Sequence, residues 1–185
     1  MRYIKLIILF LSYFALVASL EAKVDACGTA VNFSTKQSIQ YQHLKLSPTV
    51  TMDFTQKIAK SSSNGVVIAS NVICQKLNGA AYTGSVAEWK KFIDSGVSGL
   101  IKTGFTNLSF TNVGTDDKVY KGSLDNQEYI FIGTVKGNVQ HIYNVAILDK
   151  AINTVYTLSV SGNEAKKDDV RAEFERLVAS FKPQS

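Results

Sequence analysis

The chain has 185 residues, of which 45% are hydrophobic and 19% are charged, and its formal net charge is +5. This length is enough for one domain with a hydrophobic core of its own. The lysines and arginines are scattered along the chain, so the charge pattern excludes a dense basic groove for nucleic acid.

The first residues have the pattern of an export signal. Arg2 and Lys5 give a basic start, and residues 7–18 are an almost unbroken apolar run followed by small residues. This pattern is typical of a cleaved secretory signal. The run is shorter than the ~20 residues of a membrane-spanning helix, so no permanent membrane span is expected. We predict a cleaved signal peptide over 1–22, a single globular domain over 23–185, and a secreted or periplasmic location.

Cys27 and Cys74 are the only cysteines. An exported protein meets oxidising conditions, so the sequence predicts a disulfide between them. Two separate buried thiols are the alternative, because cysteine packs well as a small apolar residue. Lipidation of Cys27 is a further alternative, which Asp25 disfavours because the motif before an acylated cysteine is normally small and apolar. Two cysteines without histidines at ligand spacing do not predict a metal site.

The first part of the domain has the alternation of β-strands. Polar and apolar residues alternate over 38–46, and again over 50–54 after a break at Pro48. Residues 66–77 are rich in valine and isoleucine and predict a longer strand. Residues 60–65 have the composition of the turn between these strands.

One amphipathic helix follows, predicted over 85–103. Ser85 and Glu88 have the spacing of a capping box, in which Glu88 reaches back to the Ser85 amide. Gly104 stands where a left-handed C-cap is favoured. The apolar residues follow three-and-four spacing and predict one buried stripe. They are Val86, Trp89, Phe92, Ile93, Val97, Leu100 and Ile101.

The second half predicts a run of strands and a final helix. The strands are expected over 105–113, 118–124, 127–135, 139–148 and 154–160, with a turn at Asp125 and Asn126. The final helix is predicted over 166–181 and ends before Pro183. Its apolar stripe is expected to be Val170, Phe174, Leu177, Val178 and Phe181. Together these elements predict an α+β fold: a largely antiparallel sheet, or meander, flanked by an internal helix and a C-terminal helix.

The end of the chain resembles exported bacterial members of the Mog1/PsbP-like superfamily. The resemblance rests on the strand at 155–162 (VYTLSVSG) and the helix at 174–181 (FERLVASF), where Leu177 stands at the family's branched position. The family's Pro-x-Gly-Trp segment is absent. The resemblance implies a sheet flanked by helices and an accessory or interaction role, with no shared catalytic residues. The rival fold is a Bet v1-like helix-grip, for which the final helix is short.

No catalytic motif emerges from the sequence. His43 and His141 are the only histidines, and neither has a cysteine or carboxylate at a diagnostic spacing. The acidic pairs at 116–117 and 168–169 are explained by turn chemistry and by the helix dipole. The sequence therefore predicts no catalytic residue, no cofactor and no metal.

Tyrosines recur through the predicted meander at Tyr120, Tyr129, Tyr143 and Tyr156. Tyrosine combines apolar area with a polar handle, so an interaction surface and ordinary sheet packing both explain them. We predict an exported, non-enzymatic binding or protein-interaction domain, whose partner is a protein of the exported compartment. The contact surface is expected at an open sheet edge or at the tyrosines. A small secreted hydrolase, assembled only in space, and a carrier of a small apolar ligand remain alternatives.

Overall fold

The computed structural model describes residue 28, residues 31–63 and residues 65–183. The elements follow the order of the chain, and two short 3-10 turns precede β5 and α2. They are β1 (Gln37–Lys45), β2 (Thr51–Ser63), β3 (Val66–Asn78), α1 (Val86–Lys102), β4 (Thr106–Asn112), η1 (Thr115–Asp117), β5 (Asp125–Val135), β6 (Asn138–Asp149), β7 (Thr154–Asn163), η2 (Glu164–Lys166) and α2 (Lys167–Ala179).

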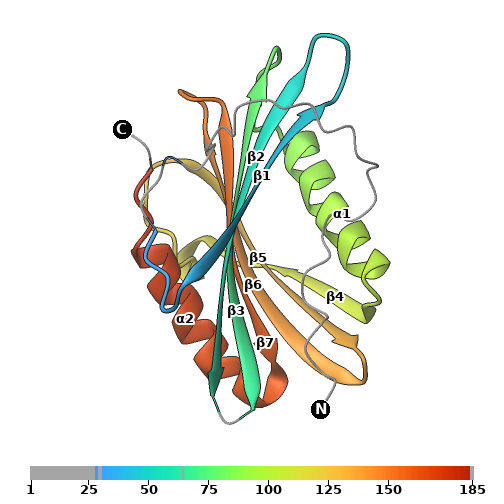
Figure 1. Ribbon diagram of the computed structural model, residues 1–185, viewed down its shortest axis with the longest axis vertical. Coiled ribbons are helices and arrows are strands. Elements are labelled where there is room, and N and C mark those ends of the chain that lie inside the picture. Colours follow the sequence, from blue (N-terminus) through green and yellow to red (C-terminus); the bar gives the residue numbers. More distant parts are fainter. Residues whose placement is uncertain (1–27, 29–30, 64, 184–185) are drawn as a thin grey trace.

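All seven of these strands form one antiparallel sheet in the order β1-β2-β3-β7-β6-β5-β4. The last strand, β7, lies between β3 and β6 and so joins the two halves of the sheet. Figure 1 shows the helices on opposite sides of the sheet, with α1 on one face and α2 on the other. The predicted α+β fold with an antiparallel sheet and two flanking helices is confirmed.

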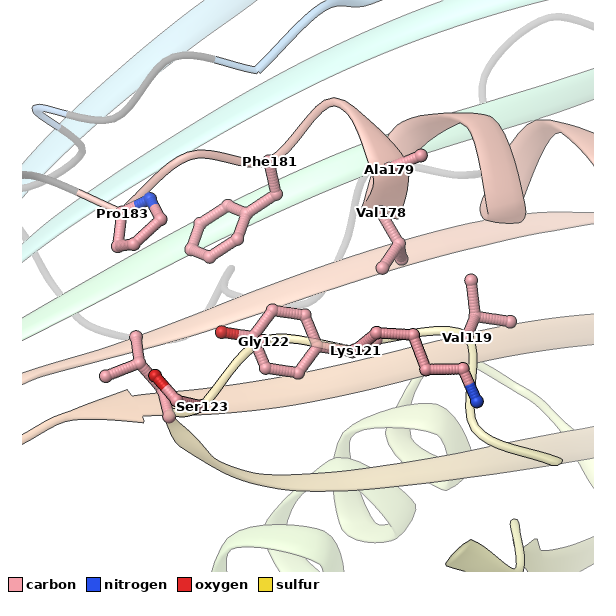
Figure 2. A pocket seen from close by; sticks show the side chains of 10 residues that line it. Val119, Lys121, Gly122, Ser123, Val178, Ala179, Phe181 and Pro183 are labelled. Carbon is pink, nitrogen blue, oxygen red and sulfur yellow. The ribbon is translucent and has the colours of Figure 1, made fainter. Parts of the chain in front are cut away.

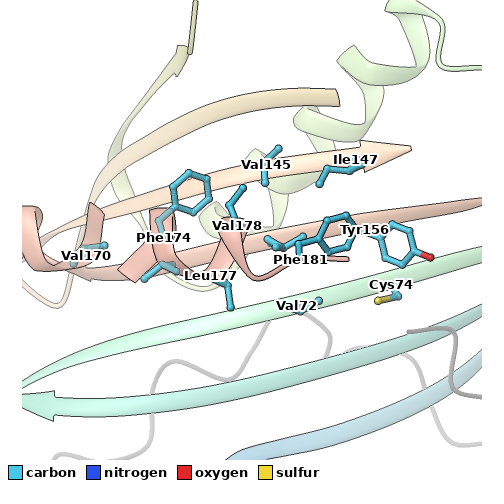
Figure 3. Close-up of a cluster of buried hydrophobic side chains, with 12 residues drawn as sticks. Val72, Cys74, Val145, Ile147, Tyr156, Val170, Phe174, Leu177, Val178 and Phe181 are labelled. Atoms are coloured by element: carbon cyan, nitrogen blue, oxygen red, sulfur yellow. The ribbon is translucent and has the colours of Figure 1, made fainter. Parts of the chain in front are cut away.

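Helix α2 covers one face of the sheet and buries the predicted residues. Figure 3 shows the resulting cluster, in which the helix side chains lie against β3, β6 and β7. Burying one such side chain contributes roughly 1.5–3 kcal/mol relative to exposure. The helix contributes Val170, Phe174, Leu177 and Val178, followed by Phe181, and the sheet contributes Val72, Cys74, Val145, Ile147, Tyr156, Leu158 and Val160.

Helix α1 covers the other face, but its buried stripe is narrower than predicted. Trp89 and Leu100 are buried against β5, β6 and β7. Val86 is 87% exposed and Ile101 is 57% exposed, so the prediction is wrong at these two positions. Val86 is the first residue of the helix, and Ile101 lies about 100° round the helix from Leu100.

The start of α1 is held differently from a capping box. The Ser85 hydroxyl accepts from the Glu88 amide at 3.3 Å, as predicted. The Glu88 carboxylate, however, accepts from the amides of Thr83 at 2.8 Å and Gly84 at 2.7 Å instead of the Ser85 amide. The Glu88 side chain therefore reaches past Ser85 to the two residues before it. At the other end, Gly104 has the predicted left-handed backbone, with a φ of +92°.

Residues 118–124 are a loop, so the strand predicted there is wrong. The Glu128 carboxylate accepts the backbone amide of Val119 at 2.9 Å and that of Tyr120 at 3.3 Å. These amides therefore need no neighbouring strand. The turn predicted at Asp125 and Asn126 is also wrong, because both residues pair with β6 as the start of β5.

Part of the sequence interpretation lies outside the described residues. The signal peptide over 1–22 and Cys27 belong to this part, so leader cleavage and the Cys27–Cys74 disulfide stay predictions. Cys74 itself is fully buried on the α2 face. Within the described part of the chain, no helix is long and apolar enough to cross a membrane.

Candidate functional site

The four tyrosines do not share one surface. Tyr129 is 4% exposed and packs on the α1 face, whereas Tyr156 is fully buried on the α2 face. Tyr120 and Tyr143 are half-buried on the α2 side. Burial, with the negative charge of Asp149, raises the pKa of Tyr156 to about 12, so its hydroxyl stays protonated. Sheet packing accounts for Tyr129 and Tyr156, while a partner for Tyr120 or Tyr143 stays a prediction.

His43 lies opposite a carboxylate that the sequence spacing did not reveal. His43 Nδ1 and Asp53 Oδ1 are 2.7 Å apart, and the Asn78 amide donates to Asp53 Oδ2 at 2.9 Å. Burial acts to raise the pKa of the Asp53 carboxyl, but the hydrogen bonds and the charges of His43 and Lys76 hold that pKa below its usual value. His43 and Asp53 lie equally far from Pro48 on either side. In an antiparallel hairpin that turns at Pro48 they face each other, so the hairpin register is the sequence signal for this pair.

His141 also pairs with a carboxylate. Its Nε2 contacts Glu164 Oε2, and its ring stacks on Tyr143 with centroids 6.2 Å apart. His141 is on β6 and His43 on the edge strand β1, and neither histidine is among the described residues that line the two grooves below. The hydrolase hypothesis needs a histidine beside a carboxylate, and the described residues contain two such pairs. Neither histidine lines either of the two grooves.

The sheet has two edges among the described strands, β1 and β4. Natural proteins commonly protect such edges with lysine or proline, because an unpaired strand edge attracts other strands. Strand β1 ends at Lys45 and follows Lys36, whereas β4 has the sequence TNLSFTN with no charge and no proline. Within the described residues β4 pairs only with β5. Among the described residues its other edge is therefore unpaired and uncharged, and a bulge between Thr106 and Ser109 leaves residues 109–112 as its regular part.

A groove of about 540 Å³ lies directly beside this edge, between α1 and β4. We call it the α1–β4 groove. Lys90 and Asp94, at 2.7 Å, form an ion pair there and cancel each other's charge. The described lining residues are Val86, Trp89, Lys90, Ile93, Asp94, Val97, Phe110, Asn112 and Gln127.

The aromatic side of the α1–β4 groove is a packed cluster. Phe110 is 39% exposed, and its ring lies 5.6 Å from Phe131 and 5.9 Å from Tyr129, centroid to centroid. The rings of Tyr129 and Phe131 are themselves 5.2 Å apart. Phe110 is thus held by buried rings on one side while its other side faces the groove. Such a supported, half-exposed aromatic ring offers contact area at a low entropic cost.

A second groove of about 480 Å³ lies at the end of α2 (Figure 2). We call it the α2-end groove. The loop at 119–124 forms one wall, and the last turn of α2 with the residues after it forms the other. The described lining residues are Val119, Tyr120, Lys121, Gly122, Ser123, Leu124, Val178, Ala179, Phe181 and Pro183. Among the described residues there is no group of three or more histidine, cysteine, aspartate or glutamate side chains that could hold a metal ion.

Comparison with known proteins does not supply a family. No protein-family model and no curated protein matches the chain. Among solved structures, the chain is similar to the protein of unknown function PA94 from Pseudomonas aeruginosa, at 10% identity over 82% of this chain and 86% of that chain, with a TM-score of 0.39. It is also similar to LpqN of Mycobacterium tuberculosis, which is involved in cell envelope biogenesis, at 9% identity over 78% of this chain and 92% of that chain, with a TM-score of 0.45. Similarity at this level says nothing of function, and membership of the Mog1/PsbP-like superfamily stays a prediction.

Proposed function

We propose that this protein is an exported, non-enzymatic accessory domain that binds an extended segment of a partner protein along β4. The observation that carries the proposal is the open, uncharged edge of β4 lying directly beside the α1–β4 groove. An extended peptide that pairs with a sheet edge gains its affinity from main-chain hydrogen bonds. Neighbouring pockets for alternate side chains give such binding its specificity.

The groove indicates the chemistry of the bound segment. Alternate residues of an added strand point to opposite faces of the sheet, so every second side chain would lie on the face covered by α1. Those side chains would meet Phe110, Ile93 and Val97, and the Lys90–Asp94 pair leaves the groove without net charge. The segment is therefore expected to alternate uncharged apolar residues with polar ones.

A defined peptide tests the proposal directly. The probe is a nine-residue peptide of alternating valine and threonine, followed in NMR spectra of the ¹⁵N-labelled domain. We expect it to shift the amide resonances of β4 and of the α1 residues that line the groove. The same peptide with N-methyl groups on every amide, which removes the main-chain donors along both edges, is expected to cause no such shifts. Shifts confined to β1, or no shifts, would show that β4 is not a binding edge.

A matched pair of substitutions supplies the control. Phe110 and Val139 are each 39% exposed and each lies in a strand, but only Phe110 lines the groove. Phe110→Glu places an unpaired charge in the groove and is expected to weaken peptide binding at least tenfold. Val139→Glu is expected to leave it unchanged. Equal effects of the two substitutions would contradict the proposed site.

A further inference from the structure

The α2-end groove has the size and walls of a small-molecule site. Its volume of about 480 Å³ lies within the range of roughly 300–1,000 Å³ that is common for ligand pockets. Figure 2 shows the loop at 119–124 facing Val178, Phe181 and Pro183. Val119 and Leu124 complete an apolar lining.

The loop wall is built without help from a ligand. The buried Glu128 carboxylate holds the backbone amides of Val119 and Tyr120 from beneath. The Tyr120 ring lies against Gly122, where a Cβ atom would come within 2.3 Å of the hydroxyl oxygen. On the other side the ring packs on Phe181, with centroids 6.2 Å apart. A preformed wall reduces the ordering cost of binding.

The polar groups of the groove are suited to an anion. Burial, with the negative charge of Asp149, raises the pKa of the Tyr120 hydroxyl, so it stays protonated and can donate its hydrogen. Lys121 and Ser123 supply an ammonium group and a second hydroxyl. Lys121 is the single charged residue among the described lining residues, and no lining residue is acidic. The groove thus combines apolar walls with one positive charge and hydrogen-bond donors.

We propose that the α2-end groove binds a small amphiphilic acid, that is, a molecule with an apolar chain and one carboxylate. The chain lies between Val178, Leu124 and Phe181, and the carboxylate meets Lys121. This assignment is independent of peptide binding at β4, because the two grooves lie on opposite faces of the sheet and share no lining residue.

Decanoate, below its micellar concentration, is the probe, with decanol as the matched uncharged ligand. Binding is measured by calorimetry and by NMR shifts of the ¹⁵N-labelled domain. We expect decanoate to shift amides of residues 119–124 and 178–182 and to bind about tenfold more tightly than decanol, as a charge-assisted contact allows. Binding of neither ligand, equal binding of both, or shifts confined to the α1–β4 groove would overturn the proposal.

Substitutions separate this site from a non-specific apolar contact. Lys121→Met keeps the length of the side chain and removes its charge, so decanoate is expected to lose its advantage over decanol. Lys90→Met, in the α1–β4 groove, is the matched control and is expected to preserve that advantage. If Lys121→Met leaves the tenfold difference intact, the carboxylate does not meet Lys121. Phe110→Glu is expected to weaken peptide binding at least tenfold and leave decanoate binding unchanged, so each proposal can fail alone.

Discussion

Two glutamates on the α2 side experience opposite surroundings. Glu173 accepts hydrogen bonds from Arg176, Ser70 and Ser34, and the Arg176 contact is the main cause that holds the pKa of its carboxyl below the usual value. Glu128 is buried more completely, and this desolvation raises the pKa of its carboxyl although Val119 and Tyr120 donate to it. At neutral pH the ionised Glu173 carboxylate therefore stabilises the fold. The ionised Glu128 carboxylate instead costs free energy, because burial removes its hydration.

Glu173→Gln is expected to destabilise the domain by about 1–3 kcal/mol at pH 7, because charged hydrogen bonds to Arg176 and two serines are weakened. Since the native pKa is lowered, the stabilisation is present above the ordinary value of 4.5 and is lost as the pH falls through the native pKa. Urea unfolding at several pH values measures both effects. The exposed Glu175, which pairs with Arg171, is the control, and Glu175→Gln is expected to change stability by less than about 0.5 kcal/mol. Equal effects of the two changes would contradict this role.

For Glu128, the free energy of unfolding is expected to change with pH in the direction opposite to that for Glu173, and Glu128→Gln tests this. Because the native pKa is raised above 4.5, the folded state binds the proton more tightly, and the contribution of Glu128 to stability grows as the pH falls from its native pKa towards 4.5. The glutamine variant is expected to lose this dependence while its side-chain oxygen still accepts an amide. Unfolding free energies over the acid range, compared with the unchanged chain, measure the difference. An identical pH dependence in both proteins would show that Glu128 does not titrate differently on folding.

At the scale of single elements, the correct predictions are those that depend on residues close together in the sequence. The stripe of α2 and the glycine after α1 depend on residues a few positions apart, and both predictions are confirmed. The segment 118–124 is a loop because its amides bond to Glu128, a partner that only the tertiary structure supplies. The contact between His141 and Glu164 likewise joins two elements that lie apart in the sequence. The pair His43–Asp53 is different, because the register of the β1–β2 hairpin points to it.

Two glycines of the same helical region allow a matched test at this scale. A Cβ at Gly96 would meet the Phe131 ring at an ordinary contact distance of 3.7 Å, so Gly96→Ala is expected to stabilise the domain by roughly 0.5–1 kcal/mol. Gly104→Ala forces alanine into a backbone with a φ of +92° and is expected to destabilise by about 1–2 kcal/mol. Thermal unfolding of both variants measures the signs. Destabilisation by Gly96→Ala would mean that α1 packs more tightly on β5 than the structure shows.

At the scale of the whole molecule, hydrogen bonds attach the N-terminal segment to the end of α2. The Arg176 guanidinium donates to the Asn32 carbonyl at 2.9 Å, and the Ser180 hydroxyl accepts the Asn32 amide at 3.1 Å. These contacts fix the chain a few residues after Cys27 against α2. Cys74 is buried beneath the same face. The attachment of residues 31–34 to α2 is thus consistent with the predicted disulfide.

The exported protein is expected to begin at Lys23 and to contain a Cys27–Cys74 disulfide. N-terminal sequencing tests the cleavage, and alkylation of the unfolded protein, with and without prior reduction, tests the disulfide by intact mass. We expect two added groups after reduction and none before. Reduction is expected to lower stability by roughly 4 kcal/mol in the chain-entropy description, less any strain. Two added groups without reduction would show separate thiols, and an acyl group on Cys27 would show a lipoprotein.

The central place of β7 has a consequence for the order in which the molecule is made. The strands β1–β3 and β4–β6 form two half-sheets, and β7, the strand that unites them, comes after both in the chain, with α2 later still. Until β7 and α2 are synthesised, neither half has its inner neighbour, and the face that α2 covers stays exposed. Pairing of β3 with β7 also joins segments that are far apart in the sequence, which slows folding. The nascent chain therefore stays incompletely folded until β7 and α2 have emerged, a state that suits passage through a narrow channel better than a finished domain would.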